Sequence, residues 1–260
     1  HAASAFYPSP FKDAIILTAD GVGEWATTTV AIGNENKLEI KKEIHFPHSL
    51  GLLYSAFTYY TGFKVNSGEY KLMGLAPYGN NKYSKKILEN LIDVKNDGSF
   101  RLNIDFFDYV TGLKMTNDKF HKLFGHQARI SEKENITQFH MDIASSIQDV
   151  LEQVVIKITR SMKKNNSSKN LCLAGGVALN CVANGKILKE SGYKNIWIQP
   201  AAGDAGGAVG AALAYWFHEK SKKRNINKND SMKGSYIGSE YKNEFIKKKL
   251  EEKKNEISLL

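Results

Sequence analysis

The sequence predicts an α/β fold in which helices cover a parallel sheet. Two successive units of strand, glycine loop and helix occupy residues 171–217. Such units place consecutive strands in parallel and bring their loops to the carboxyl edge of the sheet, where open α/β sheets bind ligands. In addition, apolar residues recur at helical spacing over residues 137–162, which predicts a long amphipathic helix.

The N-terminal region predicts antiparallel strands. Residues 14–19 (AIILTA) form an apolar, β-branched run that ends at the glycine-rich turn DGVG, residues 20–23. Residues 27–32 (TTTVAI) then predict the second strand of a hairpin, and residues 38–44 predict a third strand. From residue 49 to residue 63 the apolar spacing changes to that of a helix.

The chain between residues 83 and 134 has no clean hydrophobic period and predicts a helical or irregular insertion. After the long helix come the two repeated units. We expect a strand at 171–173, a loop at 174–176, a helix at 177–189, a strand at 196–198, a loop at 201–207 and a helix at 208–217.

The composition is that of a soluble globular protein, with 42% hydrophobic and 24% charged residues. No apolar run approaches the about 20 residues that a membrane-spanning helix needs, and no secretory signal precedes the first strand, so we predict a cytoplasmic protein. The net charge of +9 favours a nucleic-acid partner at first sight. However, residues 218–260 carry +5 of that charge, so nucleic-acid binding is not the preferred interpretation.

The chain divides into three predicted parts. Residues 1–217 form one domain, residues 218–235 are rich in Lys, Asn and Ser and predict a linker, and residues 236–260 predict the start of another domain with an amphipathic helix at 244–255. The opening on His1 predicts the interior of a longer protein. Cys172 and Cys181 lack redox and zinc-ribbon spacing, so we expect them to pack as small apolar side chains.

Three glycine loops are candidate sites of chemistry. In DGVGE (20–24), a carboxylate and two glycines at a hairpin turn suit a metal or an oxyanion, although an ordinary turn is the simpler interpretation. In AGGVALN (174–180), free amides at a helix start suit a nucleotide, with a structural turn as the alternative. In GDAGG (203–207), Asp204 is a candidate metal ligand or helix N-cap.

Histidines elsewhere are weaker candidates. His45 and His48 form an HxxH pair, but Pro47 between them predicts extended chain instead of one helical face. We therefore do not prefer this pair as a metal site.

Six stretches together resemble the O-carbamoyltransferase family, which includes nodulation-type carbamoyltransferases and enzymes that carbamoylate antibiotics. They are HAASAFYPSPF (1–11), DGVGEWATT (20–28), FPHSLGLLYSAFTYYTGF (46–63), GEYKLMGLAPYG (68–79), LAGGVALNCVANGKI (173–187) and PAAGDAGGAVGAAL (200–213). They occur in the family's order, which is more specific than any single motif. The resemblance implies an actin/sugar-kinase/Hsp70-like, ribonuclease H-like fold with duplicated mixed sheets flanked by helices.

The resemblance also implies a reaction. In the family, a YrdC-like C-terminal domain makes carbamoyl adenylate from carbamoyl phosphate and ATP, and a domain like this one transfers the carbamoyl group to a hydroxyl of a small-molecule or sugar acceptor. His1 corresponds to the second histidine of an HxxxH pair and Asp204 to a later aspartate, which bind a divalent metal, expected to be iron. The first histidine would lie four residues upstream of His1.

Further roles come from the same resemblance. Asp20, Gly21 and Gly23 would contact the adenylate or the acceptor, with Asp20 as a candidate general base. The nucleotide contacts would come from Gly175, Gly176, Asn180, Gly207 near the phosphates, and Lys71, although a solvated Lys71 is equally consistent. A homodimer is a further expectation of this kind.

Two alternatives stay open. A tRNA threonylcarbamoyl-adenosine modification enzyme of the same superfamily would account for the positive charge. The other alternative is a nucleotide-binding module that performs no transfer, and we expect this fragment alone to be inactive.

Overall fold

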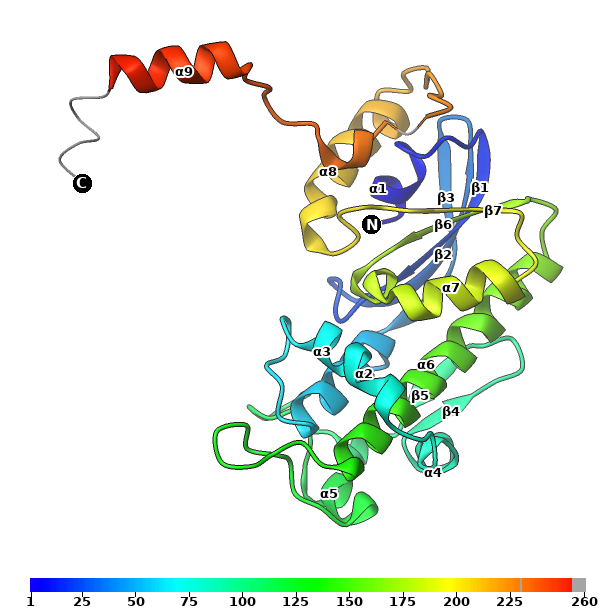
Figure 1. The fold of residues 1–260 in the computed structure, drawn as a ribbon. Helices are drawn as coiled ribbons and strands as arrows, with labels where there is room; N and C mark the ends of the chain where they lie inside the picture. Colours follow the sequence, from blue (N-terminus) through cyan, green and yellow to red (C-terminus); the bar gives the residue numbers. More distant parts are fainter. Residues whose placement is uncertain (230, 254–260) are drawn as a thin grey trace.

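The computed structural model describes residues 1–229 and 231–253 and confirms the α/β class (Figure 1). Its five-stranded mixed sheet has the order β3 (Lys37–His45), β2 (Ala26–Asn34), β1 (Asp13–Ala19), β6 (Asn170–Ala174), β7 (Asn195–Ile198). The first three strands form an antiparallel meander, whereas β6 runs parallel to β1 and β7 parallel to β6. The other sheet among the described residues is the hairpin of β4 (Ile92–Val94) and β5 (Phe100–Leu102), so these residues hold one large sheet where the resemblance implied two.

Helices cover both faces of the large sheet, because successive side chains of a strand point to opposite faces. Ala14 and Ile16 pack with α1 (Ala2–Phe6), on the face where α8 (Asp204–Ala214) also contacts α1. Ile15 and Leu17 belong to the larger core on the other face. That core also contains side chains from α2 (Leu50–Tyr60), α6 (Gln138–Lys164) and α7 (Cys181–Glu190).

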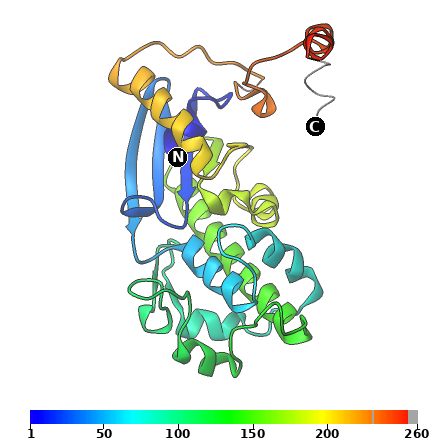
Figure 2. The ribbon, with the colours of Figure 1, turned by 90° about the vertical axis from the view of Figure 1, so that its left-hand side faces the viewer.

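The chain between β3 and β6 forms a mostly helical region below one end of the sheet in both ribbon views (Figures 1 and 2). The predicted insertion at 83–134 contains α4 (Ser84–Asn90), the β4–β5 hairpin, the 3-10 turn η2 (Ile104–Phe106) and α5 (Asp118–Phe124). Aromatic rings hold α5 against α2, with Phe120 centroids 5.1 Å from Phe57 and 5.0 Å from Tyr60. Before this insertion lie α3 (Glu69–Leu75) and the 3-10 turn η1 (Ala76–Tyr78).

Two predicted helices after β6 begin at other residues than expected. The helix predicted at 177–189 is divided into the 3-10 turn η3 (Gly176–Leu179) and α7, because Asn180 leaves the helical conformation and its side chain accepts a hydrogen bond from the Ala183 amide at 3.0 Å. The helix predicted from residue 208 begins at Asp204, whose negative charge suits the positive end of a helix. Gly207, predicted in a loop, therefore lies in helix α8.

The C-terminal part continues from α8 as a π-helical turn, Tyr215–Glu219, followed by residues 221–227 without regular secondary structure and the short turn Lys233–Ser235. Arg224, within the predicted linker, is only 7% exposed. The last helix, α9 (Asn243–Glu252), has no buried residue and lies apart from the rest of the molecule, drawn in red in Figure 2. The final residues of the helix predicted at 244–255 lie outside the described residues.

Across the described chain, every helix is too short or too polar to cross a bilayer.

Candidate metal and ligand site

His1, Asp20 and Asp204 converge beside the carboxyl ends of β1 and β6. His1 precedes α1, Asp20 follows β1, and Asp204 begins α8. The His1 Nε2 atom is hydrogen-bonded to Asp20 Oδ2 and lies 3.8 Å from Asp204 Oδ1. One ligand atom from each of the three side chains lies within 4.8 Å of the others. The two residues predicted as metal ligands therefore meet, and Asp20 joins them.

The donor chemistry of this trio fits a divalent metal. One imidazole nitrogen and two carboxylates are ligands that borderline divalent cations accept. The hydrogen bond to Asp20 raises the pKa of His1 against the opposing effect of burial. The second ring nitrogen, Nδ1, is buried and has no hydrogen-bond partner among the described residues. The described residues therefore leave the Nδ1 atom of His1 without a hydrogen-bond partner.

Backbone amides hold the Asp20 carboxylate in place. Its Oδ1 atom accepts hydrogen bonds from the amide of Gly21 at 2.8 Å and the amide of Gly176 at 3.1 Å. Burial raises the pKa of Asp20, but the hydrogen bonds from His1, Gly176 and Gly21 outweigh it and hold this pKa below its ordinary value. A carboxylate held in its ionised form is a good metal ligand and a weak base.

A cavity of about 800 Å³ opens beside the trio. This volume lies within the range of small-molecule and cofactor sites. Its lining includes five of the predicted site residues, namely Asp20, Gly21, Gly176, Asn180 and Asp204. The residues of the described chain that line the cavity include no Lys, Arg or His.

Glu69 is a third carboxylate in this lining, and the sequence analysis did not predict it. Its Oε1 atom accepts hydrogen bonds from Ser55 Oγ at 2.8 Å and the Asn66 amide at 3.0 Å, and its Oε2 atom accepts one from the Gly68 amide at 3.1 Å. These donors come from α2 and from the loop before α3. The Asn66–Glu69 spacing resembles that of a capping box, which signals a helix start, but the contact with Ser55 and the place in the cavity lining depend on the fold.

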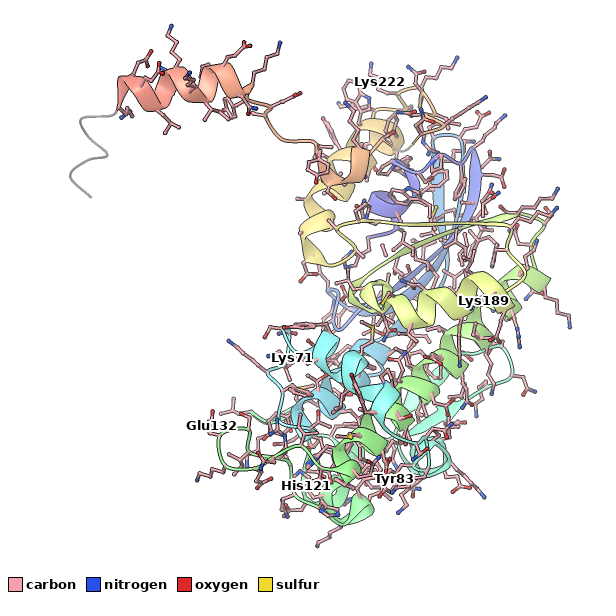
Figure 3. The ribbon with its side chains drawn as sticks, in the orientation of Figure 1. Lys71, Tyr83, His121, Glu132, Lys189 and Lys222 are labelled. Atoms are coloured by element: carbon pink, nitrogen blue, oxygen red, sulfur yellow. The ribbon has the colours of Figure 1, made fainter. Side chains whose placement is uncertain are left out.

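Five other predicted site residues are not among the lining residues of the described chain: His1, Gly23, Gly175, Gly207 and Lys71. Gly175 has φ +90°, and a Cβ there would lie 2.2 Å from the Ala19 carbonyl oxygen. At Gly23, a Cβ would lie 2.4 Å from the Ala26 oxygen, so both glycines are required by the backbone. Lys71 is exposed on α3, with its Nζ atom 5.9 Å from the ring centre of Tyr70 (Figure 3).

Asn180 lines the cavity but is also part of a buried polar network. Its Nδ2 atom donates to Gln148 Oε1 at 2.8 Å, and Gln148 Nε2 donates to Asn180 Oδ1 at 3.1 Å. The hydroxyl of Tyr54, whose pKa burial raises, donates to Gln148 Oε1 at 2.9 Å. Gln148 and Tyr54 were not predicted as site residues. A glutamine among the apolar positions of α6 is nevertheless a sequence signal for a buried polar network.

Comparisons with known proteins agree with the sequence resemblance. A family model described as Carbamoyltransferase N-terminus matches residues 1–213. The uncharacterised protein sll1178 of Synechocystis sp. is 62% identical over 246 residues, which cover 95% of this chain and 40% of that protein. Nodulation protein NolNO of Sinorhizobium fredii is 37% identical over 216 residues, covering 82% of this chain and 29% of that protein. Nodulation protein NolO of Bradyrhizobium diazoefficiens is 35% identical over 215 residues, with coverages of 82% and 36%. The chain therefore spans less than half the length of these relatives.

Proposed function

We propose, from the premise that this chain belongs to the carbamoyltransferase family, that its cavity takes part in O-carbamoyl transfer. The donor is carbamoyl adenylate and the acceptor is a hydroxyl of a small molecule or sugar. The observation that carries this proposal is the convergence of His1, Asp20 and Asp204 beside a cavity of about 800 Å³. In the reaction the acceptor oxygen bonds to the carbamoyl carbon, the bond from that carbon to the AMP phosphate oxygen breaks so that AMP leaves, and the acceptor proton passes to water.

His1, Asp20 and Asp204 would hold a divalent metal, with iron as the expected ion. A metal bound there supplies Lewis-acid polarisation of a carbonyl or phosphoryl oxygen. The amides of Gly21 and Gly176 orient Asp20 and keep it ionised. We therefore assign Asp20 to metal binding, in preference to the general-base role that the resemblance implied.

The nucleotide part of the donor would lie along η3 and the start of α7. An amide nitrogen carries two hydrogens, and Asn180 uses one of them on Gln148, so the second is available to a ligand. The cavity lining of the described chain offers no cationic side chain to the phosphate. Neutralisation of the phosphate charge is therefore assigned to the metal and to parts of the longer protein outside this chain.

The acceptor would contact Glu69, Tyr70 and Tyr109, which are among the lining residues of the cavity. A fixed carboxylate accepts hydrogen bonds from hydroxyl groups, and aromatic rings pack against the apolar faces of sugars. These residue types favour a polyhydroxy acceptor.

The strand order of the large sheet supports the proposed ribonuclease H-like fold. An antiparallel meander of three strands is followed by two strands parallel to the first, in the order β3-β2-β1-β6-β7. The ligand site then lies at the carboxyl ends of β1 and β6, as is usual for α/β sheets.

The test is carbamoyl transfer by the full-length protein that contains this chain. It would be given labelled carbamoyl phosphate, ATP and Fe²⁺ with three acceptor probes: methyl glucoside, a chitin oligosaccharide and kanamycin. We expect labelled acceptor and AMP, and a loss of at least about 100-fold in Asp20→Asn and Asp204→Asn, because each removes a metal donor. Asp93→Asn, an exposed carboxylate of β4, is the control. Wild-type rates in both site variants would refute the assignment of this site.

A further inference from the structure

Arg224 lies beyond the family match, in the segment predicted as a linker, and its side chain is buried against the connection between α1 and β1. The guanidinium donates to the carbonyl oxygens of Tyr7 at 2.9 Å, Phe6 at 2.9 Å, Ser9 at 2.6 Å and Phe11 at 2.9 Å. It also lies over the Phe6 ring, 4.5 Å from the ring centre. One side chain thus binds four backbone carbonyl groups between Phe6 and Phe11.

These bonds provide partners for backbone carbonyl groups at the end of a helix. The last carbonyl groups of a helix have no partner within it, and they form the negative end of the helix dipole. Helix α1 has five residues, too few to be stable alone. The five donors of an arginine form a rigid fork that can satisfy several carbonyl groups at once, which a lysine cannot do. Every acceptor found for Arg224 among the described residues is a carbonyl oxygen or the Ser9 hydroxyl.

The chain on either side of Arg224 strengthens this contact. We call residues 217–229 the strap. At its start, the Phe217 ring lies 5.0 Å from the Tyr7 ring, and its carbonyl accepts a hydrogen bond from Asn36 Nδ2 at 3.4 Å. Just beyond the strap, the Ser231 amide donates to the Pro8 carbonyl at 3.2 Å.

The α1 helix in turn carries His1 at its N-cap position. The His1 carbonyl accepts hydrogen bonds from the Ala5 amide at 3.0 Å and Ser4 Oγ at 2.7 Å. Helix α8 also approaches α1 so closely that a Cβ at Gly210 would lie 2.9 Å from Ser4. The contacts of α1 with α8 and with Arg224 therefore determine where the His1 imidazole meets Asp20 and Asp204.

We propose that Arg224 is a positioning residue that fixes α1 and thereby holds His1 in the metal-binding trio, so that the functional domain extends to the strap. This inference rests on the proposed function for its metal readout. Its structural part, the fixing of α1, stands on the contacts of Arg224 alone.

The experiment compares Arg224→Met with Arg129→Met in the full chain. Arg129 is a matched control because it is also buried and also donates to carbonyl groups, those of Thr61 at 2.6 Å and Glu134 at 2.7 Å, in the helical region. Hydrogen exchange is followed at the amides of residues 1–11. Mn²⁺ affinity is measured from the electron paramagnetic resonance signal of the free ion.

We expect Arg224→Met to speed exchange in residues 1–11 and to raise the Mn²⁺ dissociation constant about tenfold or more, the usual effect of losing support behind a metal ligand. Arg129→Met should leave both quantities unchanged. Arg224→Lys, the substitute if Arg224→Met does not fold, should show the same two changes to a smaller degree. Unchanged exchange and affinity in a folded Arg224 variant, or equal effects in the Arg129 variant, would overturn the inference. If the wild-type chain binds no Mn²⁺, the metal proposal fails, and the exchange rates still decide whether Arg224 fixes α1.

Discussion

Among single residues, Gln148 joins the cavity wall to the core. Its amide bonds both Asn180 and Tyr54, and its Nε2 atom also donates to Glu152 Oε1 at 2.7 Å. In Gln148→Leu, the buried Tyr54 hydroxyl and the Asn180 amide lose a partner, so we expect the free energy of unfolding to fall by about 1–3 kcal/mol. Urea unfolding measures this change. Gln153→Leu, on the exposed side of the same helix, should stay within about 0.5 kcal/mol of wild type, and an equal loss there would contradict the explanation.

A second residue, Asp142 of α6, makes the stability depend on pH. Its carboxylate is buried and accepts hydrogen bonds from Lys82 Nζ at 2.5 Å, the Asn80 amide at 2.9 Å and Gln138 Nε2 at 2.9 Å. Burial raises the pKa of Asp142, but these bonds outweigh it and lower the pKa below the ordinary 3.8. Because the folded pKa lies below the unfolded one, the stabilisation is present above pH 3.8 and is lost as the pH falls through the folded pKa.

The corresponding variant is Asp142→Asn. We expect its melting temperature to lie below that of wild type at neutral pH, and the difference to shrink once the pH falls below about 4, where the carboxyl of the unfolded wild-type chain begins to take up its proton. Thermal melts between pH 7 and pH 2.5 test this. A difference that stays constant down to the lowest pH would show that the charge of Asp142 does not stabilise the fold.

The residues of the candidate metal site could be predicted from the sequence only in part. His1 and Asp204 follow from the resemblance, and Asp20 follows from its place after an apolar strand. Their convergence needed the sheet, because they lie far apart in the chain. Glu69 could not be predicted as a site residue, since its bonds to the Asn66 and Gly68 amides indicate only a helix start, and its place in the cavity lining depends on the fold.

Among the elements, the segment of α3 and η1 is held against α6 by a glycine. A Cβ at Gly79, directly after η1, would lie 2.0 Å from the Met141 carbonyl oxygen of α6. We expect Gly79→Ala to move this segment away from α6 and to cost about 1–3 kcal/mol of stability, the usual cost of overpacking. Gly74 in α3 has open space around it, so Gly74→Ala should instead stabilise the protein by about 0.5–1 kcal/mol, because alanine favours the helix. Chemical denaturation of both variants measures these changes, and the same sign in both would contradict the role of close packing.

For some helices and strands, local sequence signals are sufficient to predict where the element begins and ends. The strands β1, β2 and β3 were predicted to within one or two residues, because apolar runs and glycine turns delimit them. The start of α7 was not, because Asn180 prefers to cap the helix that follows it. The insertion had no clean period because α5 is held by aromatic contacts with α2, which is distant in sequence.

In the molecule as a whole, charge is distributed unevenly. The cavity lining holds three carboxylates, whereas +5 of the net charge of +9 lies after residue 217, including the exposed lysines of α9. An acidic cavity does not attract a phosphate by itself. The donor would therefore need a cation that the lining residues of the described chain do not provide.

This charge distribution leads to a prediction for the 260-residue chain. The proposed donor, carbamoyl adenylate, is an anion, and we propose that a YrdC-like domain forms it from carbamoyl phosphate and ATP. The chain covers 40% of the relative to which it is 62% identical, so most of that relative's length lies outside the match. We expect the purified chain, given labelled carbamoyl phosphate, ATP, Fe²⁺ and the three acceptor probes, to yield no labelled acceptor, and the full-length protein to yield it under the same conditions. Turnover by the chain at the rate of the full-length protein would show that donor synthesis and phosphate neutralisation both reside within these 260 residues.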